Sequence, residues 1–266
     1  MFRIGYLQFN PQFGQVEHNL AHILSALQRA DADLIVLPEL ALTGYSFADR
    51  QETLSLSEDP RRSPAVDALI GLCRARDMYL ITGFDELAGE RCYNSALLLG
   101  PEGLLHTYRK LHLFGTERDW FDPGDTPLQV HDVRGLRVGM MVCFDWAFPE
   151  VSRVLALRGA DVLCHPANLV LTYCQQTMLA RCIENGVYAV TANRYGSEER
   201  PHVTRGFTGQ SQIVAPKGAL LHRGPEAGDE LTIVEIDVAL ARDKRLTPQN
   251  DILGDRRPEF YREIGG

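Results

Sequence analysis

The sequence predicts an α/β fold in which helices cover a mixed β-sheet system. Apolar runs of strand length alternate with segments that repeat apolar residues at helical spacing, and hairpins interrupt this alternation. The 266 residues are 45% hydrophobic and 23% charged, as is usual for a globular protein. No linker or low-complexity segment divides the chain, so we expect one domain over residues 1–266.

The N-terminal region predicts two strand–helix units. Apolar runs of strand length predict strands over residues 2–9 and 34–37, and the second run is wholly apolar, as expected for a strand covered on both faces. Apolar residues spaced three and four apart predict a helix over residues 16–30. A Ser-Pro pair typical of a helix start predicts the second helix, over residues 63–77.

The remainder of the chain continues the alternation and adds hairpins. Further strands are predicted over residues 78–84, 93–99, 104–112, 128–131, 136–142, 161–164, 187–193, 207–214, 219–222 and 231–236. Further helices are predicted over residues 148–158, 174–185 and 238–244. A polar tail follows from about residue 247.

Charge and cysteine usage exclude several classes of protein. The net charge of −8 and the pI near 5.5 argue against a nucleic-acid or anionic-membrane partner, because both bind basic surfaces. No apolar stretch is long enough for a membrane span or a secretory signal. Six cysteines without a C-x-x-C pair indicate free thiols in a reducing compartment, so we expect a cytoplasmic protein.

Cys143 stands where an apolar strand ends and a helix signal begins. A sharp turn of this kind presents a nucleophile above a sheet in other enzymes. Free N–H groups and the positive end of a helix dipole favour the thiolate, so this position predicts a lowered thiol pKa. A buried structural cysteine is the alternative, and it is the common case for a cysteine in apolar surroundings.

Two further polar residues stand at strand ends and support the first interpretation. Glu39 follows the apolar run 34–37, and Lys110 lies in the predicted strand 104–112. The carboxyl ends of strands in an α/β sheet converge on one rim, so the two side chains and Cys143 are expected to meet. A carboxylate, a cation and a thiol are the parts required for acyl transfer. Taken singly, each charged residue is as well explained by solvent exposure.

Other candidate sites are weaker. Cys164 and His165 are neighbours on a predicted strand, so their side chains point to opposite faces and cannot form a catalytic dyad. The eight histidines show no metal-ligand spacing, and no glycine-rich phosphate-binding loop is present. We therefore expect neither a metal ion nor a nucleotide cofactor.

Three ordered motifs resemble the signatures of the nitrilase superfamily of carbon–nitrogen hydrolases. They are Leu-Pro-Glu-Leu at 37–40, Tyr-Arg-Lys-Leu-His-Leu-Phe at 108–114, and Cys-Phe-Asp-Trp-Ala-Phe-Pro-Glu at 143–150. The resemblance extends from the first strand to the C-terminal tail. It implies a four-layer α-β-β-α sandwich and a catalytic triad formed by Glu39, Lys110 and Cys143.

The resemblance also implies a role for each site residue, and it implies no cofactor. Glu39 would act as general base and acid, and Lys110 would stabilise an oxyanion together with the backbone N–H of Phe144. Glu117 matches a second glutamate that orients the lysine or the substrate. Tyr45 and Asn168 are weaker candidates for lining the pocket. Arg181 and Glu184 are three apart on a predicted helix, which favours a structural ion pair over contact with substrate.

The motifs favour a small aliphatic amide as the substrate. Asp145 stands where the nitrile-specific branch usually has a different sequence, which favours amides. Ala147 stands where many ω-amidase-like members carry arginine, which weakens a substrate with a second carboxylate. The tail from Asn250 resembles small archaeal-type nitrilases, so aliphatic mono- and dinitriles remain an alternative, as do N-carbamyl compounds. A non-catalytic member that binds a metabolite or a partner is the alternative from another class, and it should show a broken triad.

The resemblance finally implies self-association. Family members form homodimers or larger homo-oligomers, and the tail of this chain, residues 247–266, has little apolar surface to bury alone. We therefore expect the tail to dock on a neighbouring subunit.

Overall fold

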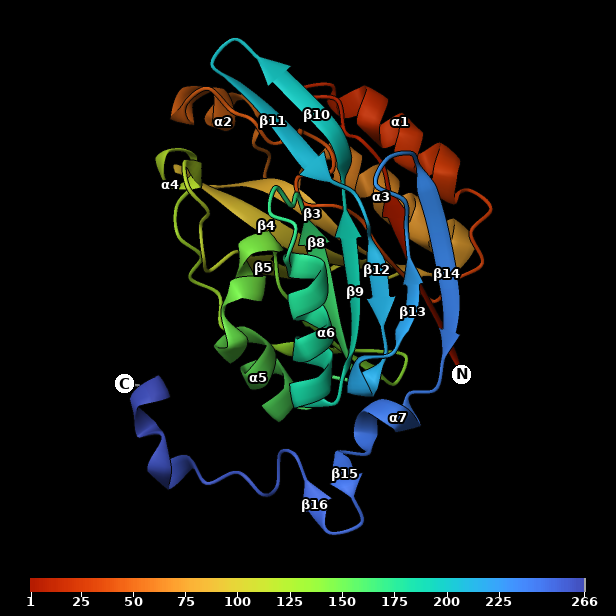
Figure 1. Cartoon of the computed structure of the whole chain (residues 1–266). Coiled ribbons are helices and arrows are strands. Elements are labelled where there is room, and N and C mark those ends of the chain that lie inside the picture. The colour runs from red at the N-terminus through yellow and green to blue at the C-terminus, as the bar shows by residue number, and fades with distance from the viewer. Residues whose placement is uncertain (266) are drawn as a thin grey trace.

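Two six-stranded sheets form the centre of the molecule in the computed structural model, which describes residues 1–265 (Figure 1). In sheet order, the first sheet contains β14 (Glu230–Ile236), β1 (Phe2–Gln8), β2 (Leu34–Val36), β3 (Tyr79–Ala88), β4 (Arg91–Gly100) and β5 (Gly103–Arg109). The second contains β13 (Leu220–Arg223), β12 (Gln212–Val214), β9 (Tyr188–Asn193), β8 (Val162–Ala167), β7 (Leu136–Met140) and β6 (Val130–Val133).

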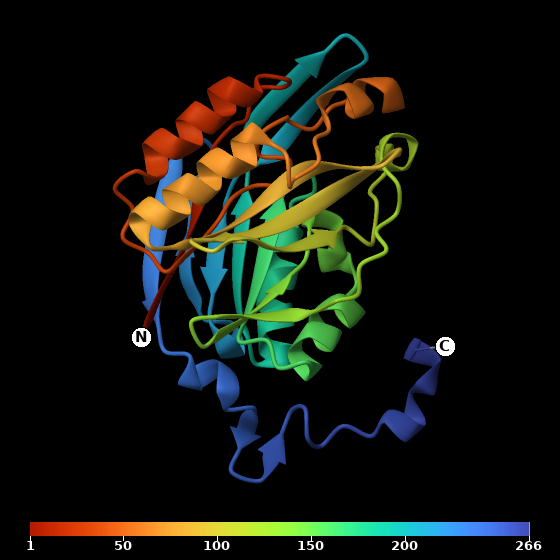
Figure 2. The ribbon, with the colours of Figure 1, turned by 180° about the vertical axis from the view of Figure 1, so that it is seen from behind.

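Two pairs of helices cover the outer faces of these sheets. The first pair is α1 (Val16–Leu27) and α3 (Pro64–Arg76), and the second is α5 (Pro149–Leu157) and α6 (Cys174–Asn185). Figures 1 and 2 show the first pair on the outer face of the first sheet and the second pair on the opposite side of the molecule. The four-layer α-β-β-α sandwich is thus confirmed.

Several shorter elements complete the chain. The helices are α2 (Arg50–Leu56), α4 (Glu117–Trp120) and α7 (Ala239–Arg242), with 3₁₀ turns at Cys143–Ala147, Pro216–Gly218, Pro258–Phe260 and Arg262–Gly265. The strands are β10 (Tyr195–Arg200) and β11 (Val203–Thr208), which form a hairpin, and β15 (Arg245–Thr247) and β16 (Asn250–Asp251). The polar sequences of α2, α4 and β10 gave no clear periodicity, and none of the three was predicted.

One predicted strand was wrong. Residues 207–214 belong to two strands, β11 and β12, which lie in different sheets. Gly209 and Gln210 between them both have positive φ, which breaks the extended backbone. The apolar pattern continues across this turn, so the periodicity alone did not reveal it.

Apolar burial holds the layers together on both sides of each sheet. Ile23 and Leu27 of α1 pack with Leu69 and Cys73 of α3 against the first sheet, and all four are fully buried. A larger cluster fills the space between the sheets and beneath α5 and α6. Each aliphatic side chain buried in this way contributes about 1.5–3 kcal/mol of transfer free energy.

The strand directions bring the predicted site residues to one region. β2 is parallel to β3, and β3, β4 and β5 are successively antiparallel, so β2 and β5 run in the same direction. Glu39 follows β2 and Lys110 follows β5, so both lie at the end of the first sheet where the C-termini of these two strands are found. Cys143 follows β7, which is parallel to β8 in the second sheet.

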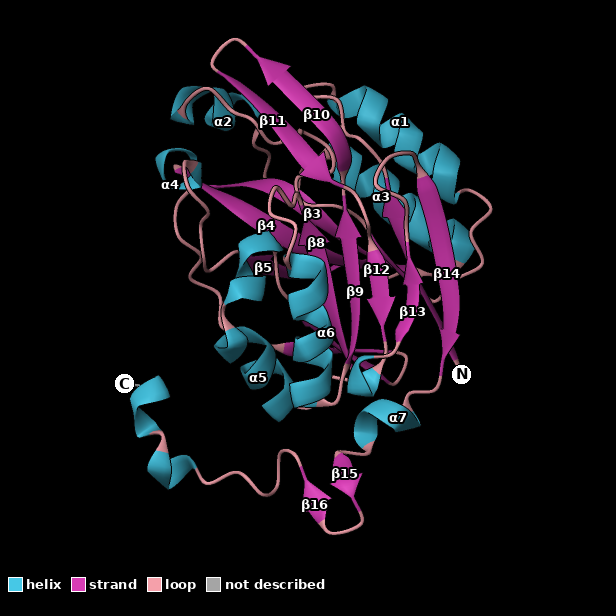
Figure 3. Ribbon diagram, viewed as in Figure 1, coloured by secondary structure: helices cyan, strands magenta, loops and turns pink. Residues whose placement is uncertain are grey.

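The C-terminal segment extends away from the sandwich. Figure 3 shows β15, β16 and the last turns at a distance from the layered body. The segment exposes Leu246, Phe260 and Ile264, each more than half accessible to solvent. No helix within residues 1–265 is long and apolar enough to cross a membrane.

A pair of half-buried histidines lies where the two sheets meet at their β5 and β6 edges. The rings of His106 on β5 and His131 on β6 have centroids 3.9 Å apart and are tilted by 33° relative to each other. Burial is the main cause that lowers the pKa of His106 from 6.5 to about 4, and the charge of the neighbouring His131 adds to it. Burial also lowers the pKa of His131. Both rings are therefore held neutral in the folded protein at neutral pH.

This pair predicts a loss of stability in mild acid. Because His106 has a lower pKa in the folded than in the unfolded chain, unfolding takes up a proton, and stability falls as the pH drops below about 6.5 toward 4. Relative to wild type, His106→Phe should remove about 1 kcal/mol of the change in unfolding free energy between pH 7.5 and pH 5, after allowance for partial exposure. Urea unfolding at both pH values measures this difference. The control is His202→Phe, at an exposed site. If the unfolding free energy changes equally between the two pH values in both variants, the prediction is contradicted.

Candidate active site

Glu39 enters the space between the sheets directly after β2. Its side chain is fully buried, and the next residue, Leu40, has a φ of 48°. Gly83 of β3 passes so close that a Cβ there would lie 2.3 Å from the Cα of Glu39. Only glycine at position 83 therefore allows β3 to run beside this carboxylate.

Lys110 is a fully buried cation between two carboxylates. Its Nζ lies 2.7 Å from Oε1 of Glu39 and 2.7 Å from Oε2 of Glu117, and all three side chains are 0% exposed. Burial by itself lowers the pKa of Lys110, but the attraction of Glu117 and Glu39 outweighs it and raises the pKa overall. Lys110 is therefore charged, and the structure brings it together with Glu39 as expected.

Glu117 is also part of this cluster, and a network of donors fixes its position. Tyr45 donates its hydroxyl to Oε1 of Glu117, and the backbone N–H of Phe114 donates to Oε2 over 3.2 Å. Burial raises the pKa of Glu117, although Lys110 opposes this shift. The alternative that Glu117 is a solvated loop charge is therefore wrong, because its side chain is fully enclosed.

The carboxylate of Glu39 has one occupied and one unoccupied oxygen. Asn94 on β4 donates its Nδ2–H to Oε1 over 2.7 Å, beside the bond from Lys110. Oε2 is buried and has no hydrogen-bond partner among the described residues. This oxygen is the one available to accept a proton. The contribution of Asn94 was missed by the sequence analysis, because an asparagine inside a strand gave no signal of its own.

Cys143 opens a 3₁₀ turn, Cys143–Ala147, immediately after the second sheet's β7 region. Its φ of 41° is in the left-handed region, which strains a residue with a side chain, as at other nucleophile turns. The prediction of a lowered thiol pKa was wrong. Burial and the charge of Glu39 raise the pKa of Cys143 well above its ordinary value, although Lys110 and a backbone hydrogen bond from Asn168 oppose the shift. A short 3₁₀ turn in a dry site cannot offset the loss of solvation.

Asp145 supports the turn that carries Cys143. Its fully buried carboxylate accepts the backbone N–H of Val142 over 2.9 Å and the hydroxyl of Tyr108 over 2.8 Å. The ring and the backbone N–H of His112 contact its other oxygen. Both carboxylate oxygens of Asp145 thus accept hydrogen bonds from the protein itself, and they stabilise the turn. The expected link between Asp145 and amide substrates is therefore indirect.

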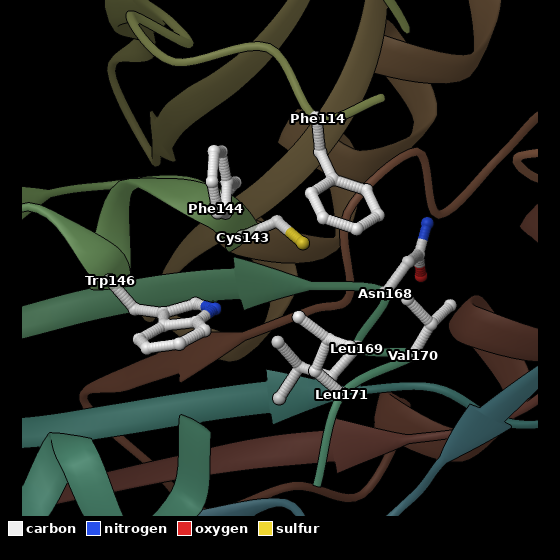
Figure 4. Close-up of a pocket in the computed structure, with 8 residues that line it drawn as sticks. All are labelled: Phe114, Cys143, Phe144, Trp146, Asn168, Leu169, Val170 and Leu171. Atoms are coloured by element: carbon white, nitrogen blue, oxygen red, sulfur yellow. The ribbon is translucent and has the colours of Figure 1, made fainter. Parts of the chain in front are cut away.

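A small apolar pocket lies in front of the sulfur of Cys143 (Figure 4). The empty space in and in front of it is about 240 Å³, part of which is open to solvent, and Figure 4 shows the sulfur facing the space beside Phe114 and Asn168. The lining residues are Phe114, Cys143, Phe144, Trp146, Asn168, Leu169, Val170 and Leu171. None of these side chains carries a permanent charge.

Asn168 and Tyr45 differ in their relation to this pocket. Asn168 lines it and donates its Nδ2–H to the backbone oxygen of Glu39 over 2.9 Å, which ties the two sheets together beside the site. Tyr45 is not among the lining residues, and its hydroxyl contacts Glu117 instead.

Two further pairs of residues that the sequence singles out lie outside the catalytic cluster. Arg181 and Glu184 form the expected ion pair on α6, with 3.0 Å between Nη1 and Oε1. Cys164 and His165 form no dyad, but the ring of His165 does contact the backbone oxygen of Cys143. No group of three or more His, Cys, Asp or Glu side chains within residues 1–265 is arranged to hold a metal ion.

Comparison with known proteins agrees with this geometry. Residues 3–246 match the family model for carbon–nitrogen hydrolases. The chain is 41% identical to a nitrilase from Pyrococcus abyssi, covering 98% of this chain and 99% of that one. It is 36% identical to an (R)-stereoselective amidase from a Pseudomonas species, covering 96% and 91%.

Solved structures lead to the same family. A variant of the amidase from Nesterenkonia sp. AN1, with acrylamide added at its active-site cysteine, aligns with a TM-score of 0.82. It shares 27% sequence identity, and the alignment covers 99% of both chains. The fold and the buried Glu-Lys-Cys cluster define a cysteine-dependent acyl-transfer enzyme. The chain belongs to the carbon–nitrogen hydrolase family, whose nitrilase and amidase members it resembles over almost its whole length.

The cluster predicts that Lys110→Met will destabilise the protein strongly. The change leaves Glu39 and Glu117 buried without their cation, which should cost about 3–5 kcal/mol of unfolding free energy at pH 7.5. The loss should become smaller toward pH 5, because the unpaired carboxylates can then be neutralised by protonation. Urea unfolding at both pH values measures the effect. Lys217→Met, at an exposed site, is the control, and an equal loss in both variants would contradict the prediction.

Proposed function

We propose that the protein hydrolyses small, uncharged aliphatic amides to a carboxylate and ammonia through a thioester at Cys143. The observation that carries this proposal is the pocket in front of Cys143, whose walls are aromatic and aliphatic side chains and one amide, Asn168, none with a permanent charge. Such a pocket favours a short apolar acyl group. The similarity to two amidases supports an amide as the substrate, with ammonia as the leaving group.

In the acylation half of the proposed reaction, Cys143 attacks the amide carbon. Oε2 of Glu39 takes the thiol proton, because the raised pKa of Cys143 keeps the resting sulfur protonated. The C–S bond forms, and the carbonyl oxygen becomes an oxyanion stabilised by Lys110 and the backbone N–H of Phe144. Glu39 then returns the proton to nitrogen, the C–N bond breaks, and ammonia leaves.

In the deacylation half, water replaces ammonia. Glu39 accepts a proton from the water as its oxygen attacks the thioester carbon. A second oxyanion forms in the same place and collapses as the C–S bond breaks. The proton returns to the sulfur, and the carboxylic acid leaves. Throughout, Glu117 holds Lys110 in position, and Tyr45 and Phe114 hold Glu117.

A substrate with a second carboxylate is disfavoured by the surroundings of the pocket. Position 147 is alanine. Arg181 bonds to Glu184 and to the backbone oxygen of Trp146, so its guanidinium is occupied. A carboxylate entering this pocket would lose its hydration without gaining a cation.

Nitriles form the second candidate substrate class, and a specific observation favours it. The 41% identical relative from Pyrococcus abyssi is named a nitrilase. The same thiol can add to a nitrile carbon, and the uncharged lining of the pocket does not favour an alkyl amide over the corresponding nitrile. N-carbamyl compounds are a third class, compatible with the chemistry. A non-catalytic role is disfavoured, because all members of the triad are present, Lys110 contacts Glu39, and the charges of both act on the thiol of Cys143.

Ammonia release from a substrate panel tests the proposal. Acetamide, propionamide and isobutyramide should be hydrolysed at least tenfold faster, by kcat/KM, than succinamate, propionitrile, glutaronitrile or N-carbamyl-β-alanine, a difference of about 1.4 kcal/mol in barrier. Cys143→Ala should remove turnover while leaving the unfolding free energy within about 1 kcal/mol of wild type.

The panel can also reject the proposal. Turnover of nitriles alone would replace the amide interpretation with the nitrile one. Hydrolysis by Cys143→Ala at a rate similar to wild type would contradict the thioester mechanism. Iodoacetamide labelling followed by mass spectrometry adds a check on site identity, since Cys143 should react before the other five buried thiols.

We propose in addition that the protein is a homodimer that buries the outer face of α5 and α6. Leu157 on α5 and Ile183 on α6 are exposed, and a groove lined by α5 and the tail contains Val154, Pro258 and Tyr261. The tail would then rest on the neighbouring subunit. All six cysteines are free and buried, which is compatible with the reducing, cytoplasmic compartment that we also propose.

Charge substitutions on this face test the dimer. Leu157→Asp and Ile183→Asp should shift the sedimentation coefficient from dimer to monomer at micromolar concentration, because an interface cannot bury an unpaired carboxylate without cost. Leu105→Asp on β5 is a matched control, because Leu105 is 41% exposed and Leu157 is 44% exposed. Sedimentation that is unchanged in both test variants would contradict the proposed interface.

A further inference from the structure

His165 is a buried histidine that contacts the nucleophile's backbone, and the proposed mechanism does not yet use it. It lies on β8 and is 0% exposed. Its Nε2 is 2.9 Å from the carbonyl oxygen of Cys143, and its Nδ1 is 3.1 Å from Oγ1 of Thr191 on β9. Both ring nitrogens therefore have a partner.

The partners determine which nitrogen carries the proton. A carbonyl oxygen can only accept a hydrogen bond, so Nε2 must donate to Cys143. Nδ1 is then the acceptor, and the hydroxyl of Thr191 donates to it. Burial lowers the pKa of His165, in agreement with a neutral ring. His165 thus cannot serve as a base toward the thiol, because its one acceptor atom faces Thr191.

The peptide that His165 holds contains the N–H assigned to the oxyanion. The carbonyl of Cys143 and the N–H of Phe144 belong to one planar unit, and the structure contains no cis peptide bond within residues 1–265. In a trans peptide the two groups point in opposite directions. A bond that fixes the carbonyl toward β8 therefore directs the N–H of Phe144 away from β8.

The N–H of Phe144 is free to bind a ligand. In the same turn, the N–H of Asp145 donates to Val142 and that of Phe148 donates to Asp145. No acceptor is present for the N–H of Phe144 in the part of the chain that the structure describes. Phe144 itself lines the pocket beside the sulfur, so this donor lies next to the reacting carbon.

The turn at Cys143 is strained, and the peptide that follows it must keep one orientation for its N–H to face an oxyanion. A residue with a side chain at φ 41° is less stable than in an ordinary conformation by about 1–3 kcal/mol. Rotation of the peptide between Cys143 and Phe144 changes ψ of Cys143 and φ of Phe144 and leaves the positive φ of Cys143 in place. It would replace the N–H by a carbonyl oxygen, which repels an oxyanion. Asp145 fixes the preceding peptide through Val142. The i→i+3 pattern of the 3₁₀ turn places the N–H of Trp146 on the carbonyl of Cys143, and His165 is the second donor to that oxygen, from outside the turn.

We propose that His165 is a positioning residue that holds the Cys143–Phe144 peptide with its N–H directed at the oxyanion. Its bond exists in only one orientation of the peptide, because a rotated peptide would present an N–H to the N–H of Nε2. This inference rests on the proposed function for the use of that N–H, whereas the contact itself does not depend on the substrate.

Two variants and two reactions test the proposal. His165→Phe removes the donor and keeps the ring volume, and His165→Gln keeps an N–H donor. For amide hydrolysis we expect kcat of His165→Phe to fall about 100-fold, with KM within threefold, since loss of a complete oxyanion donor costs about 10²–10³. His165→Gln should recover to within tenfold of wild type.

Alkylation of Cys143 by iodoacetamide is the matched control reaction. The sulfur displaces iodide at a tetrahedral carbon, so no oxyanion forms and the N–H of Phe144 is not required. The alkylation rate of His165→Phe should therefore stay within threefold of wild type. A parallel fall of alkylation and hydrolysis would show a general structural role and overturn the proposal. Undiminished hydrolysis would overturn it as well.

A spectroscopic measurement on the wild-type protein tests the hydrogen bond of His165 directly. ¹⁵N NMR of histidine-labelled wild type should show His165 as the neutral Nε2–H tautomer from pH 5.5 to 8, and an Nδ1–H tautomer or a charged ring would overturn the proposal. Because this measurement uses the wild-type protein, it tests the proposal even if His165→Phe does not fold. If wild type hydrolyses no amide, the proposed substrate class fails, and the same comparison of variants is made on whichever panel compound it does hydrolyse.

Discussion

The structure of the site depends on one interaction, the sharing of the Lys110 cation between two buried carboxylates. Each of the three groups would be costly to bury alone, and the three together satisfy one another. Glu39, Lys110 and Glu117 come from three separate segments, so this cluster can form only when the loops after β2 and β5 and helix α4 are in place. Assembly of the first sheet and assembly of the acid–base machinery are therefore one event.

The second sheet supplies the nucleophile through a different principle, a strained turn held by hydrogen bonds. The carboxylate of Asp145 and the ring of His165 contact consecutive parts of the backbone around Cys143 from two sides. Neither side chain touches the sulfur, and together they restrict the backbone that presents it. The first sheet thus determines the charges in the site, and the second determines the geometry of the reacting atom.

Much of this arrangement could be predicted from the sequence, because strand ends and helix periods are local signals. Glu39 and Cys143 follow apolar runs, Lys110 lies in a predicted strand, and the convergence of strand ends placed the three together. The hydrogen bonds of Asn94 and His165 could not be predicted, because each joins a strand to a loop or turn elsewhere in the chain, 55 and 22 residues away. The pKa of Cys143 was predicted in the wrong direction, because burial depends on the packing of both sheets and is not visible in residues 136–150.

The protonated state of Cys143 also affects how long the enzyme survives in the presence of oxidants. Peroxides attack the thiolate and react slowly with the thiol, so oxidation to sulfenic acid follows thiolate character and exposure. Cys143 is 5% exposed, and its raised pKa leaves almost no thiolate in the resting site. The proton moves to Glu39 only as an acyl group approaches. The burial that makes a general base necessary therefore also protects the resting nucleophile from oxidation.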